Sequence, residues 1–404
     1  MEREIAYYKD GTPYTTNGEP LIVITGDKPT SSATINNWWG KPGMSSGSSW
    51  DPKDDRMTHE WKGNFSAEDE VTKEELAEAN KRAQERMKKL NEDLAIAKTV
   101  YTQNSASEKN NKVILDNKQR ELNANSELLA KAGNSASKYI LRDKGKLLYI
   151  DFLTSQINYF DSQAKRMSSD AVQTNLSAYL PLTTAAVVRQ RISDAKTKND
   201  EANKTFAKVT PLKNELKQKA DEEAVDVKSA IKFSADFYKE LTEKLGEQSS
   251  KVAQELAAAA KGKQIPNAEA ALKAFDKYKD VLNKKFSVKD REAIKKALAS
   301  LNRDEMGKNF AKFSKAFKFV GNSVDVYDVA VEFQKATDTN NYRPFFIKLE
   351  TLAAGRVATA ITAFAFSLIV GTPMGILGFA LIMTVVGVMV DEKLMAKINK
   401  LVGI

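Results

Sequence analysis

The most uneven part of the hydrophobic pattern lies near the C-terminus. Residues 357–390 form a run of 34 positions without one charged side chain, in a chain that is otherwise rich in charge. In its middle, Gly371-Thr372-Pro373-Met374-Gly375 is typical of a turn. A single helix of this length would extend about 50 Å, well beyond a hydrocarbon core of about 30 Å. The pattern therefore predicts two apolar helices, Val357–Val370 and Ile376–Val390, joined by a tight turn.

Helices that are apolar on every face must be buried, either inside the protein or in a bilayer. The two arms have only 14 and 15 residues, fewer than the roughly 20 of a membrane span, so flanking residues such as Leu349–Gly355 or Leu394–Leu401 would have to extend them. We expect the pair to be the buried centre of a soluble protein and to insert into a membrane later; the alternative is a core pair that never leaves. The residues assigned to this membrane hairpin are Val357, Ile361, Phe364, Phe366, Leu368, Ile369, Gly371, Pro373, Gly375, Ile376, Leu377, Phe379, Leu381, Val385 and Val390.

The residues before this run have the spacing of amphipathic helices. Phe233, Phe237, Leu241 and Leu245 follow one another at intervals of four, as on one helix face. Pro266-Asn267 opens another helix, and Ser287 with Asp290 has the pattern of a capping box. About seven such helices precede the apolar pair. Residues 226–404 are therefore predicted to form a compact bundle of roughly ten helices around a buried hydrophobic hairpin, in an all-α protein.

Residues 66–225 are also predicted to be helical, but in longer segments. Glu74–Lys98 and Ala195–Lys228 are polar helices, and Lys138–Leu182 between them is richer in aromatic residues. This order predicts an elongated antiparallel helical hairpin with a distinctive tip, which is either a receptor epitope or a small satellite core. The candidate receptor-binding residues are Tyr139, Leu148, Tyr149, Phe152, Tyr159 and Phe160.

Residues 1–65 differ from the rest because they are rich in Gly, Pro, Ser, Thr and Asn and lack helical periodicity. They are predicted to form a disordered arm with a local strand at Leu21–Thr25. All four tryptophans of the chain lie here, including Trp38, Trp39 and Trp50. Tryptophans in a polar arm are typical binding anchors, although they could instead pack loosely on the neighbouring helical region.

The charge is concentrated in the half that holds the apolar run. The chain has a net charge of +9, and residues 226–404, with 28 Lys and Arg against 20 Asp and Glu, carry +8 of it. Basic helices beside an apolar segment suit an anionic lipid surface; a lysine-rich solvated surface is the plainer interpretation. A nucleic-acid partner is not expected, since no basic cluster is interleaved with stacking aromatics.

The chemistry of most enzymes is missing from the sequence. There is no cysteine, and His59 is the only histidine, so catalytic triads and histidine or thiolate metal sites are not expected. No phosphate-binding glycine motif appears. We therefore expect neither enzymatic activity nor a cofactor. Met1–Asp10 has no apolar core of a signal peptide, which predicts synthesis as a soluble cytoplasmic chain that reaches a membrane only afterwards.

Several stretches carry a family resemblance. Phe237–Glu247, Ala253–Ala257 and Phe275–Phe286, together with Phe366-Ser367-Leu368, Gly371–Gly378 and Ile398–Ile404, resemble the channel-forming domain of the pore-forming colicins, closest to the colicin E-one branch. Ala6–Tyr14 resembles the N-terminus of that branch. The likeness covers about 180 C-terminal residues and about the first 15.

The resemblance implies a bacteriocin that is released from the producing cell. Residues 66–225 would bind an outer-membrane receptor, residues 1–65 would engage the Tol or TonB machinery, and residues 226–404 would form a voltage-gated channel in the inner membrane of the target. A cognate immunity protein would block that channel. Tyr7–Tyr14 favours Tol by likeness, whereas Glu19–Val23 resembles a TonB box, an extended segment able to add a strand to a sheet. The candidate translocation residues are Tyr7, Tyr8, Asp10, Gly11, Tyr14, Glu19, Leu21, Val23, Trp38, Trp39 and Trp50.

The trigger for insertion is expected to be an anionic, mildly acidic surface. Carboxylates such as Asp325, Asp328, Asp391 and Glu392 would lose their charge there while the lysines keep theirs, and membrane voltage would then draw basic segments inward. One rival is a permanently membrane-anchored helical stalk, structural or related to secretion. Another is a bacteriocin that kills as a nuclease or by cleaving peptidoglycan, which the single histidine disfavours.

Overall fold

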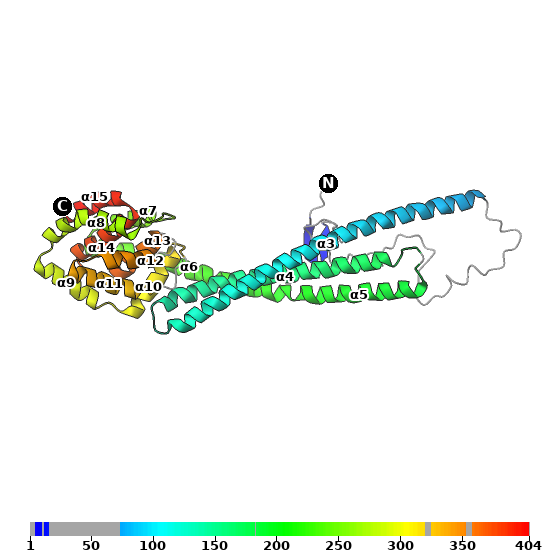
Figure 1. Ribbon diagram of the computed structural model, residues 1–404, viewed down its shortest axis with the longest axis horizontal. Helices are drawn as coiled ribbons and strands as arrows, with labels where there is room; N and C mark the ends of the chain where they lie inside the picture. The colour runs from blue at the N-terminus through cyan, green and yellow to red at the C-terminus, as the bar shows by residue number, and fades with distance from the viewer. Residues whose placement is uncertain are drawn as a thin grey trace. The chain divides into compact units, whose positions relative to one another are not determined.

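The computed structural model describes residues 5–9, 12–15, 73–181, 183–319, 325–352 and 358–403 (Figure 1). These residues form an all-α protein with one small sheet. The strands are β1 (Ile5–Lys9) and β2 (Thr12–Thr15). The helices are α3 (Lys73–Ala132), α4 (Ser137–Ser177), α5 (Ala185–Ala207), α6 (Val209–Leu245), α7 (Glu247–Ala259), α8 (Ala268–Lys285), α9 (Val288–Ala299), α10 (Arg303–Ala316), α11 (Val326–Thr339), α12 (Arg343–Leu352), α13 (Ala358–Val370), α14 (Ile376–Val390), the 3-10 helix η2 (Glu392–Leu394) and α15 (Met395–Val402).

The two strands form an antiparallel ribbon that the pattern analysis did not predict. Tyr7 is opposite Tyr14, and Tyr8 is opposite Pro13. The sequence between the strands is Asp10-Gly11, which is the usual composition of a two-residue hairpin loop. That signal would have found the ribbon. The strand predicted at Leu21–Thr25 lies outside the described residues, as does most of the predicted arm.

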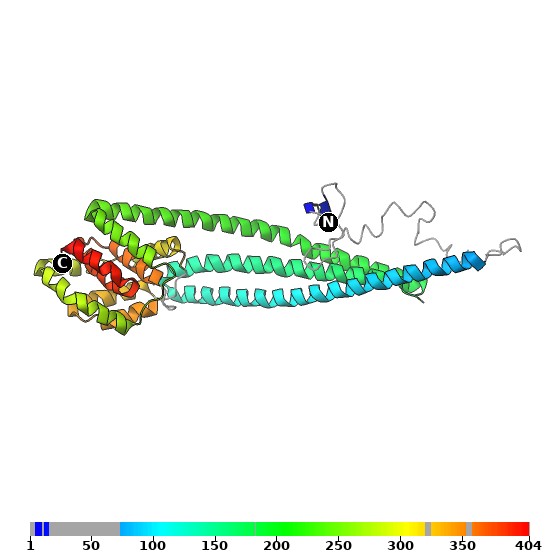
Figure 2. The same cartoon turned by 90° about the horizontal axis from the view of Figure 1, so that it is seen from above.

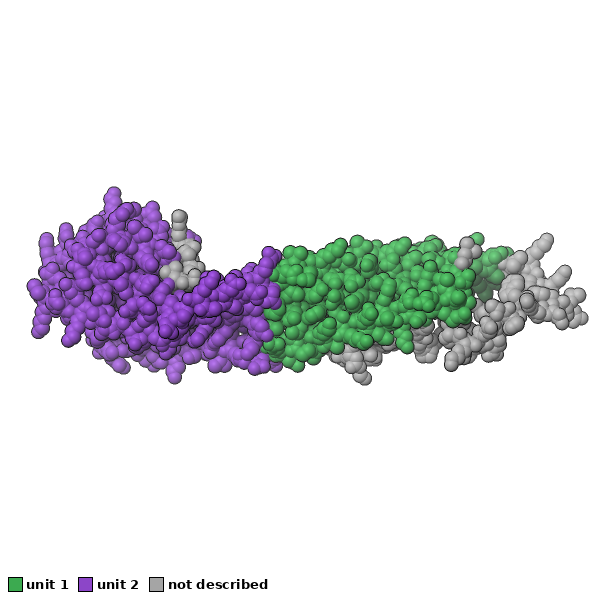
Figure 3. Space-filling model, turned by 60° about the horizontal axis from the view of Figure 1, so that its bottom comes forward, with its two compact units in different colours: residues 1–118, 152–216 green, residues 119–151, 217–404 purple. Residues whose placement is uncertain are grey.

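Contacts between residues divide the chain into two units, which Figure 3 colours separately. Unit 1 comprises residues 1–118 and 152–216, and unit 2 comprises residues 119–151 and 217–404. The second unit thus contains the end of α3 and the beginning of α4. It also contains most of α6 and all the helices that follow α6. The pattern analysis had instead placed one boundary at residue 225 and assigned all of 119–151 to the middle region.

Unit 1 is built from three antiparallel helical segments. The amide of Asn104 on α3 donates to the carbonyl of Lys165 on α4 at 3.3 Å, and that of Asn111 donates to Asn158 at 3.2 Å. On the other side of α4, Lys198 of α5 donates to Asp170 at 3.0 Å. Ala171 and Ala195 are fully buried, and small side chains of this kind let the helices approach closely.

The predicted tip of the helical hairpin has a different structure from the one expected. Lys138–Leu182 does not cap two flanking helices; almost all of it is α4, which is itself one of the long antiparallel segments (Figure 2). Its aromatic residues face the neighbouring helices instead of gathering at an end. The chain reverses direction on either side of α4, near residues 133–136 and 178–184.

Unit 2 contains the predicted helical bundle. Within its described residues, α6–α15 are ten α-helices, and α13 and α14 lie at their centre (Figure 1). The predicted starts are confirmed: Asn267 caps α8, and Ser287 and Asp290 form the capping box of α9. Each cap satisfies backbone N–H groups that a helix end leaves without partners. These short, separately capped helices can therefore surround the central pair from several directions.

Candidate functional site

The two apolar helices predicted from the sequence are present with almost the predicted bounds. Twelve of the thirteen residues of α13 and thirteen of the fifteen of α14 are buried. A helix with one buried stripe would show a polar face, and these two show none. The prediction of a hydrophobic hairpin stored inside its own domain is confirmed.

The connection between the two arms is the exposed end of this hairpin. Pro373 and Gly375 are exposed, while Thr372 is buried and donates from Oγ1 to the carbonyl of Leu368 at 2.7 Å. Gly371 sits close to the shell, since a Cβ there would lie 3.1 Å from the side chain of Leu301. The apex is thus the part of the hairpin that meets solvent.

The polar side chains of α13 are satisfied by the helix to which they belong. Thr362 donates to the carbonyl of Ala358 at 3.1 Å, and Ser367 donates to that of Phe364 at 2.7 Å. Ser and Thr hydroxyls in helices often bond in this way to a carbonyl in the preceding turn. These bonds can persist when the surroundings change from protein to lipid, so the two hydroxyls do not tie the arm to its shell.

Aromatic rings hold α13 from one side. The ring of Phe366 lies 4.8 Å from that of Phe237 on α6 and 5.4 Å from that of Phe313 on α10 (centroid distances). Tyr238 completes this group, and burial raises the pKa of its phenol, which keeps it neutral. Contacts of this kind add to the burial of the rings themselves.

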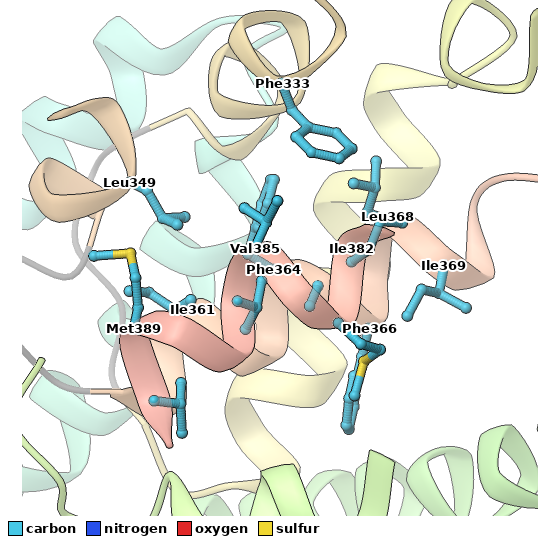
Figure 4. Packing of buried hydrophobic residues seen from close by; sticks show 14 of the residues in the cluster. Phe333, Leu349, Ile361, Phe364, Phe366, Leu368, Ile369, Ile382, Val385 and Met389 are labelled. Carbon is cyan, nitrogen blue, oxygen red and sulfur yellow. The ribbon is translucent and has the colours of Figure 1, made fainter. Parts of the chain in front are cut away.

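The opposite side of the hairpin is covered by α11 and α12. In Figure 4, Phe333 and Leu349 point from these helices toward the arms, whereas Phe366 points away from them. Phe345 links the two helices, with its ring 5.1 Å from that of Phe333 and 6.1 Å from that of Phe364. The hairpin is therefore enclosed between two aromatic layers.

Both ends of the hairpin meet at Lys263. Its carbonyl accepts a hydrogen bond from the backbone N–H of Ala358 at 2.9 Å, and its ammonium lies 4.0 Å from the carboxylate of Asp391. Ala358 begins the first arm and Asp391 follows the second. One loop residue before α8 thus marks the base of the hairpin.

The structure places the predicted hairpin residues as follows. Ile361, Phe364, Phe366, Leu368, Ile369, Phe379, Leu381, Val385 and Val390 are buried, Ile376 and Leu377 are half-buried, and Gly371, Pro373 and Gly375 form the connection. Val357 lies outside the described residues. The structure therefore brings the described members of this set together in one hairpin.

The other predicted sites are dispersed. Tyr7 and Tyr8 lie on β1 and Tyr14 on β2, whereas Asp10, Gly11, Glu19, Leu21, Val23, Trp38, Trp39 and Trp50 lie outside the described residues. The candidate receptor residues Tyr139, Leu148, Tyr149, Phe152, Tyr159 and Phe160 are all half-buried along α4. Tyr139, Leu148 and Tyr149 belong to unit 2, and the other three belong to unit 1.

Neither arm is a complete membrane span. Within the described residues, no helix combines enough length with enough apolar character to cross a bilayer. The same residues contain no group of three or more His, Asp or Glu side chains placed to hold a metal ion.

Comparison with known proteins assigns this part of the chain. Residues 216–401 match the family described as the colicin pore forming domain. Colicin-Ib of Escherichia coli is 53% identical over 171 residues, which cover 42% of this chain and 27% of colicin-Ib. Colicin-E1 of Escherichia coli is 44% identical over 178 residues, or 44% of this chain and 34% of colicin-E1. Through its C-terminal domain, the chain belongs to the pore-forming colicin family.

The similarity to these relatives covers only part of each of them. The chain spans about a third or less of the length of these two curated relatives. Colicin-Ib and colicin-E1 both match the C-terminal region in which the sequence resembles the pore-forming colicins. A solved structure that concerns the import of pyocin S5 into Pseudomonas aeruginosa is 35% identical, covering 76% of this chain and 67% of that one, with a TM-score of 0.46.

Proposed function

We propose that the protein is a bacteriocin that kills by forming a voltage-gated ion channel in the inner membrane of target bacteria. The observation that carries this proposal is the hairpin of α13 and α14, apolar on all faces and buried within a domain that matches the colicin pore-forming domain. Helices that are apolar on every face can be buried in a protein core or in a bilayer, where nothing satisfies a polar face. The match to the colicin pore-forming domain favours a hairpin that occupies the two surroundings in turn.

The steps before pore formation are assigned to the other parts of the chain. Residues 66–225 would bind an outer-membrane receptor, and residues 1–65 would be drawn through the cell envelope by the Tol or TonB machinery. Anionic lipids of the inner membrane would attract the basic C-terminal domain, residues 226–404, and a cognate immunity protein would protect the producing cell. The protein would be made in the cytoplasm, released from the cell, and reach its target as a soluble monomer.

Protonation near the membrane is proposed to loosen the domain. Asp391 lies beside Lys263 at the base of the hairpin, and Asp325 caps α11 by accepting from the N–H of Tyr327 at 3.0 Å. Loss of these charges would weaken the shell while the lysines keep their attraction to anionic lipid. Dye release from vesicles that depended on neither pH nor anionic lipid would contradict this trigger.

The channel is tested by planar-bilayer conductance of the full chain. Leu377→Asp places a charge next to the exposed apex, where the soluble fold can tolerate it, but inserting that charge into a bilayer costs about 2.5–3.5 kcal/mol. We expect wild type to give voltage-dependent steps and Leu377→Asp to give far fewer. Val288→Asp, at a position that is 74% exposed on α9, is the matched control and should behave as wild type. Absence of channels in wild type would refute the proposal.

The choice between import systems is tested separately. Replacing residues 19–23 by Gly and Ser removes the TonB-like segment and leaves Tyr7–Tyr14 unchanged. The variant and wild type are compared for killing of target cells that lack either tonB or tol function. We expect Tol-dependent killing that the replacement does not change; a loss of killing would favour TonB.

A permanently anchored helical stalk is the alternative. It predicts a protein that stays in the membrane fraction and is extracted only by detergent. A hairpin already enclosed by the other helices of its own domain favours purification without detergent. Fractionation of cells that express the full chain distinguishes the two.

A further inference from the structure

The turn between α3 and α4, residues 133–139, is docked on the pore-forming domain at α10. Ala136 is 1% exposed. A Cβ built on Gly307 of α10 would lie 2.8 Å from both the Cβ and the carbonyl oxygen of Ala136. Real Cβ atoms do not approach so closely, so this contact exists because residue 307 is glycine. The turn and the helix meet backbone to backbone.

Polar contacts surround this point. Asp304, at the start of α10, accepts from the hydroxyl of Tyr139 at 2.6 Å and pairs with the ammonium of Lys138 at 2.8 Å. The backbone N–H of Ala136 donates to Asp325, the cap of α11, at 3.3 Å. The turn thus ties together the N-terminal ends of two shell helices.

The other end of α10 is held from α4 as well. Lys315 is nearly buried and lies 3.2 Å from Asp143 of α4 and 3.1 Å from Glu223 of α6. A cavity of about 260 Å³ lies beside Lys315 among α4, α6 and α10, and its lining includes Leu147, Val227 and Ser314, whose buried hydroxyl has no hydrogen-bond partner. A contact with unfilled space beside it is easier to break than a continuous packed core.

The helix held in this way lies directly on the hairpin. α10 packs along α13, and the rings of Phe313 and Phe317 lie 5.4 and 5.8 Å from that of Phe366. α13 can leave the domain only after its contacts with α10 have been broken. Whatever fixes α10 therefore retains the hairpin.

We propose that the α3–α4 turn is an autoinhibitory contact, which holds α10 over α13 until the turn undocks. The proposal rests on the proposed pore-forming function, since it concerns the release of that hairpin. It gives the helices outside the pore-forming bundle a second role. When another protein pulls or binds these helices and displaces them, α10 is released from α13 at the same time.

The first test replaces Gly307 by Ala in the full chain. In a helix, Ala is intrinsically more stable than Gly, so helix propensity alone predicts slower hydrogen exchange in α10. The docked turn predicts the reverse, because the added Cβ collides with Ala136. We expect exchange in residues 303–316, measured in buffer without lipid, to rise by about fivefold or more, the lower range of ordinary coupling between sites. Unchanged or slower exchange would overturn the proposal.

The matched control is Gly145→Ala on α4. A Cβ there would meet only the side-chain amide of Asn125, at 3.1 Å, away from α10. Asp304→Asn tests the polar part of the contact, and Asp276→Asn on α8 removes the same charge elsewhere in the domain. We expect faster exchange in α10 for Asp304→Asn and no change for either control. Equal effects of Asp304→Asn and Asp276→Asn would show that only net charge matters, against the proposal.

The second test fixes the turn with a disulfide, which is clean because the chain has no cysteine. Ala136→Cys with Gly307→Cys carries the same crowding as Gly307→Ala, so the reduced protein is the loosened reference. The disulfide requires Cβ atoms about 3.5–4.5 Å apart and therefore holds the turn within a small shift of α10. We expect the oxidised protein to release far less dye from vesicles of equal phosphatidylcholine and phosphatidylglycerol than the reduced protein. Failure of the bond to form would contradict the close approach. Equal release in both states would refute retention.

The two measurements separate the underlying proposals. If wild type and the reduced variant release no dye, the pore-forming function fails, and hydrogen exchange in lipid-free buffer still decides whether the turn holds α10. If they release dye and oxidation has no effect, the pore stands and the autoinhibitory contact does not.

Discussion

Lys315 of α10 is a nearly buried lysine placed among acidic side chains. Its side chain is 10% exposed and faces three carboxylates, those of Asp143, Glu223 and Asp226. Burial lowers the pKa of Lys315, but the attraction of Asp143 and the hydrogen bond to Glu223 outweigh it, so that the pKa is raised overall. The lysine therefore stays charged and neutralises a site where three acids meet.

Removing the positive charge of Lys315 should lower the free energy of unfolding. Lys315→Met keeps most of the apolar stem but leaves the three carboxylates to repel one another, a loss of about 3 kcal/mol for a largely buried pair. We expect a lower midpoint in urea unfolding of the full chain. Lys312→Met, on the same helix, serves as the control; a similar loss in both variants would show that the carboxylate site is not the cause.

Asp304 gives a pH dependence of defined sign. Hydrogen bonds from Lys138, Lys308 and Tyr139 hold the pKa of this carboxyl well below its usual range. A lowered folded-state pKa adds stability above the unfolded-state pKa of about 3.9, and this is lost only as pH falls through the folded value. The difference in stability between wild type and Asp304→Asn should thus be constant from pH 7 to about pH 4 and shrink below that.

Unfolding by urea at a series of pH values checks this. A difference that disappeared already between pH 6 and pH 5, about two units above that pKa, would contradict the assignment. The expected result also bears on the proposed acid trigger for membrane insertion. Because the pKa of Asp304 is lowered, mild acidity leaves this carboxylate ionised, and Asp304 is not the group through which mild acid would act on the domain.

Among the elements, α13 depends most on aromatic contacts. Phe366 is fully buried against Phe237, Phe313 and Phe317. Truncating a buried Phe to Ala costs about 3–5 kcal/mol. Because the cost falls on the soluble fold and little of it on a membrane-inserted state, we expect Phe366→Ala to lower the unfolding temperature yet speed dye release from vesicles.

Calorimetry and vesicle release on the same preparation test this pair of effects. Thr362→Ala is the useful comparison, since its hydroxyl bonds within its own helix. A variant of Phe366 that became less stable but released dye more slowly would show that the ring is needed in the pore itself.

Much of this element-level structure could be predicted because it is local. The two arms, their turn and the caps at Asn267 and Ser287 depend on residues a few positions apart, and periodicity and capping chemistry report such spacings directly. The docking of Ala136 on Gly307 could not be found in this way. It joins residues 171 positions apart through backbone contact, and Gly307 occupies an ordinary place in an amphipathic helix. The role of α4 was missed for a related reason: an aromatic-rich segment can be a tip or a helix packed between others, and only tertiary contacts decide between them.

At the scale of the whole molecule, killing and pore formation should be separable. Deleting residues 1–65 removes the proposed translocation segment and leaves the helices that surround the hairpin. We expect the truncated protein to lose killing of intact cells, because it lacks the segment needed for import. Its dye release from vesicles should stay within about twofold of wild type, because the residues that insert into the membrane are unchanged. Loss of both activities would mean that the arm acts in the pore as well as in import.

Lys263 has a mechanical consequence for the molecule. The carbonyl of Lys263 binds the start of one arm and its ammonium faces the end of the other, so both ends of the hairpin are attached at a single residue. A force applied to the apex, at Pro373 and Gly375, then acts on both arms at once and does not separate one arm from the other. We expect the two arms to leave the domain together, with the apex leading.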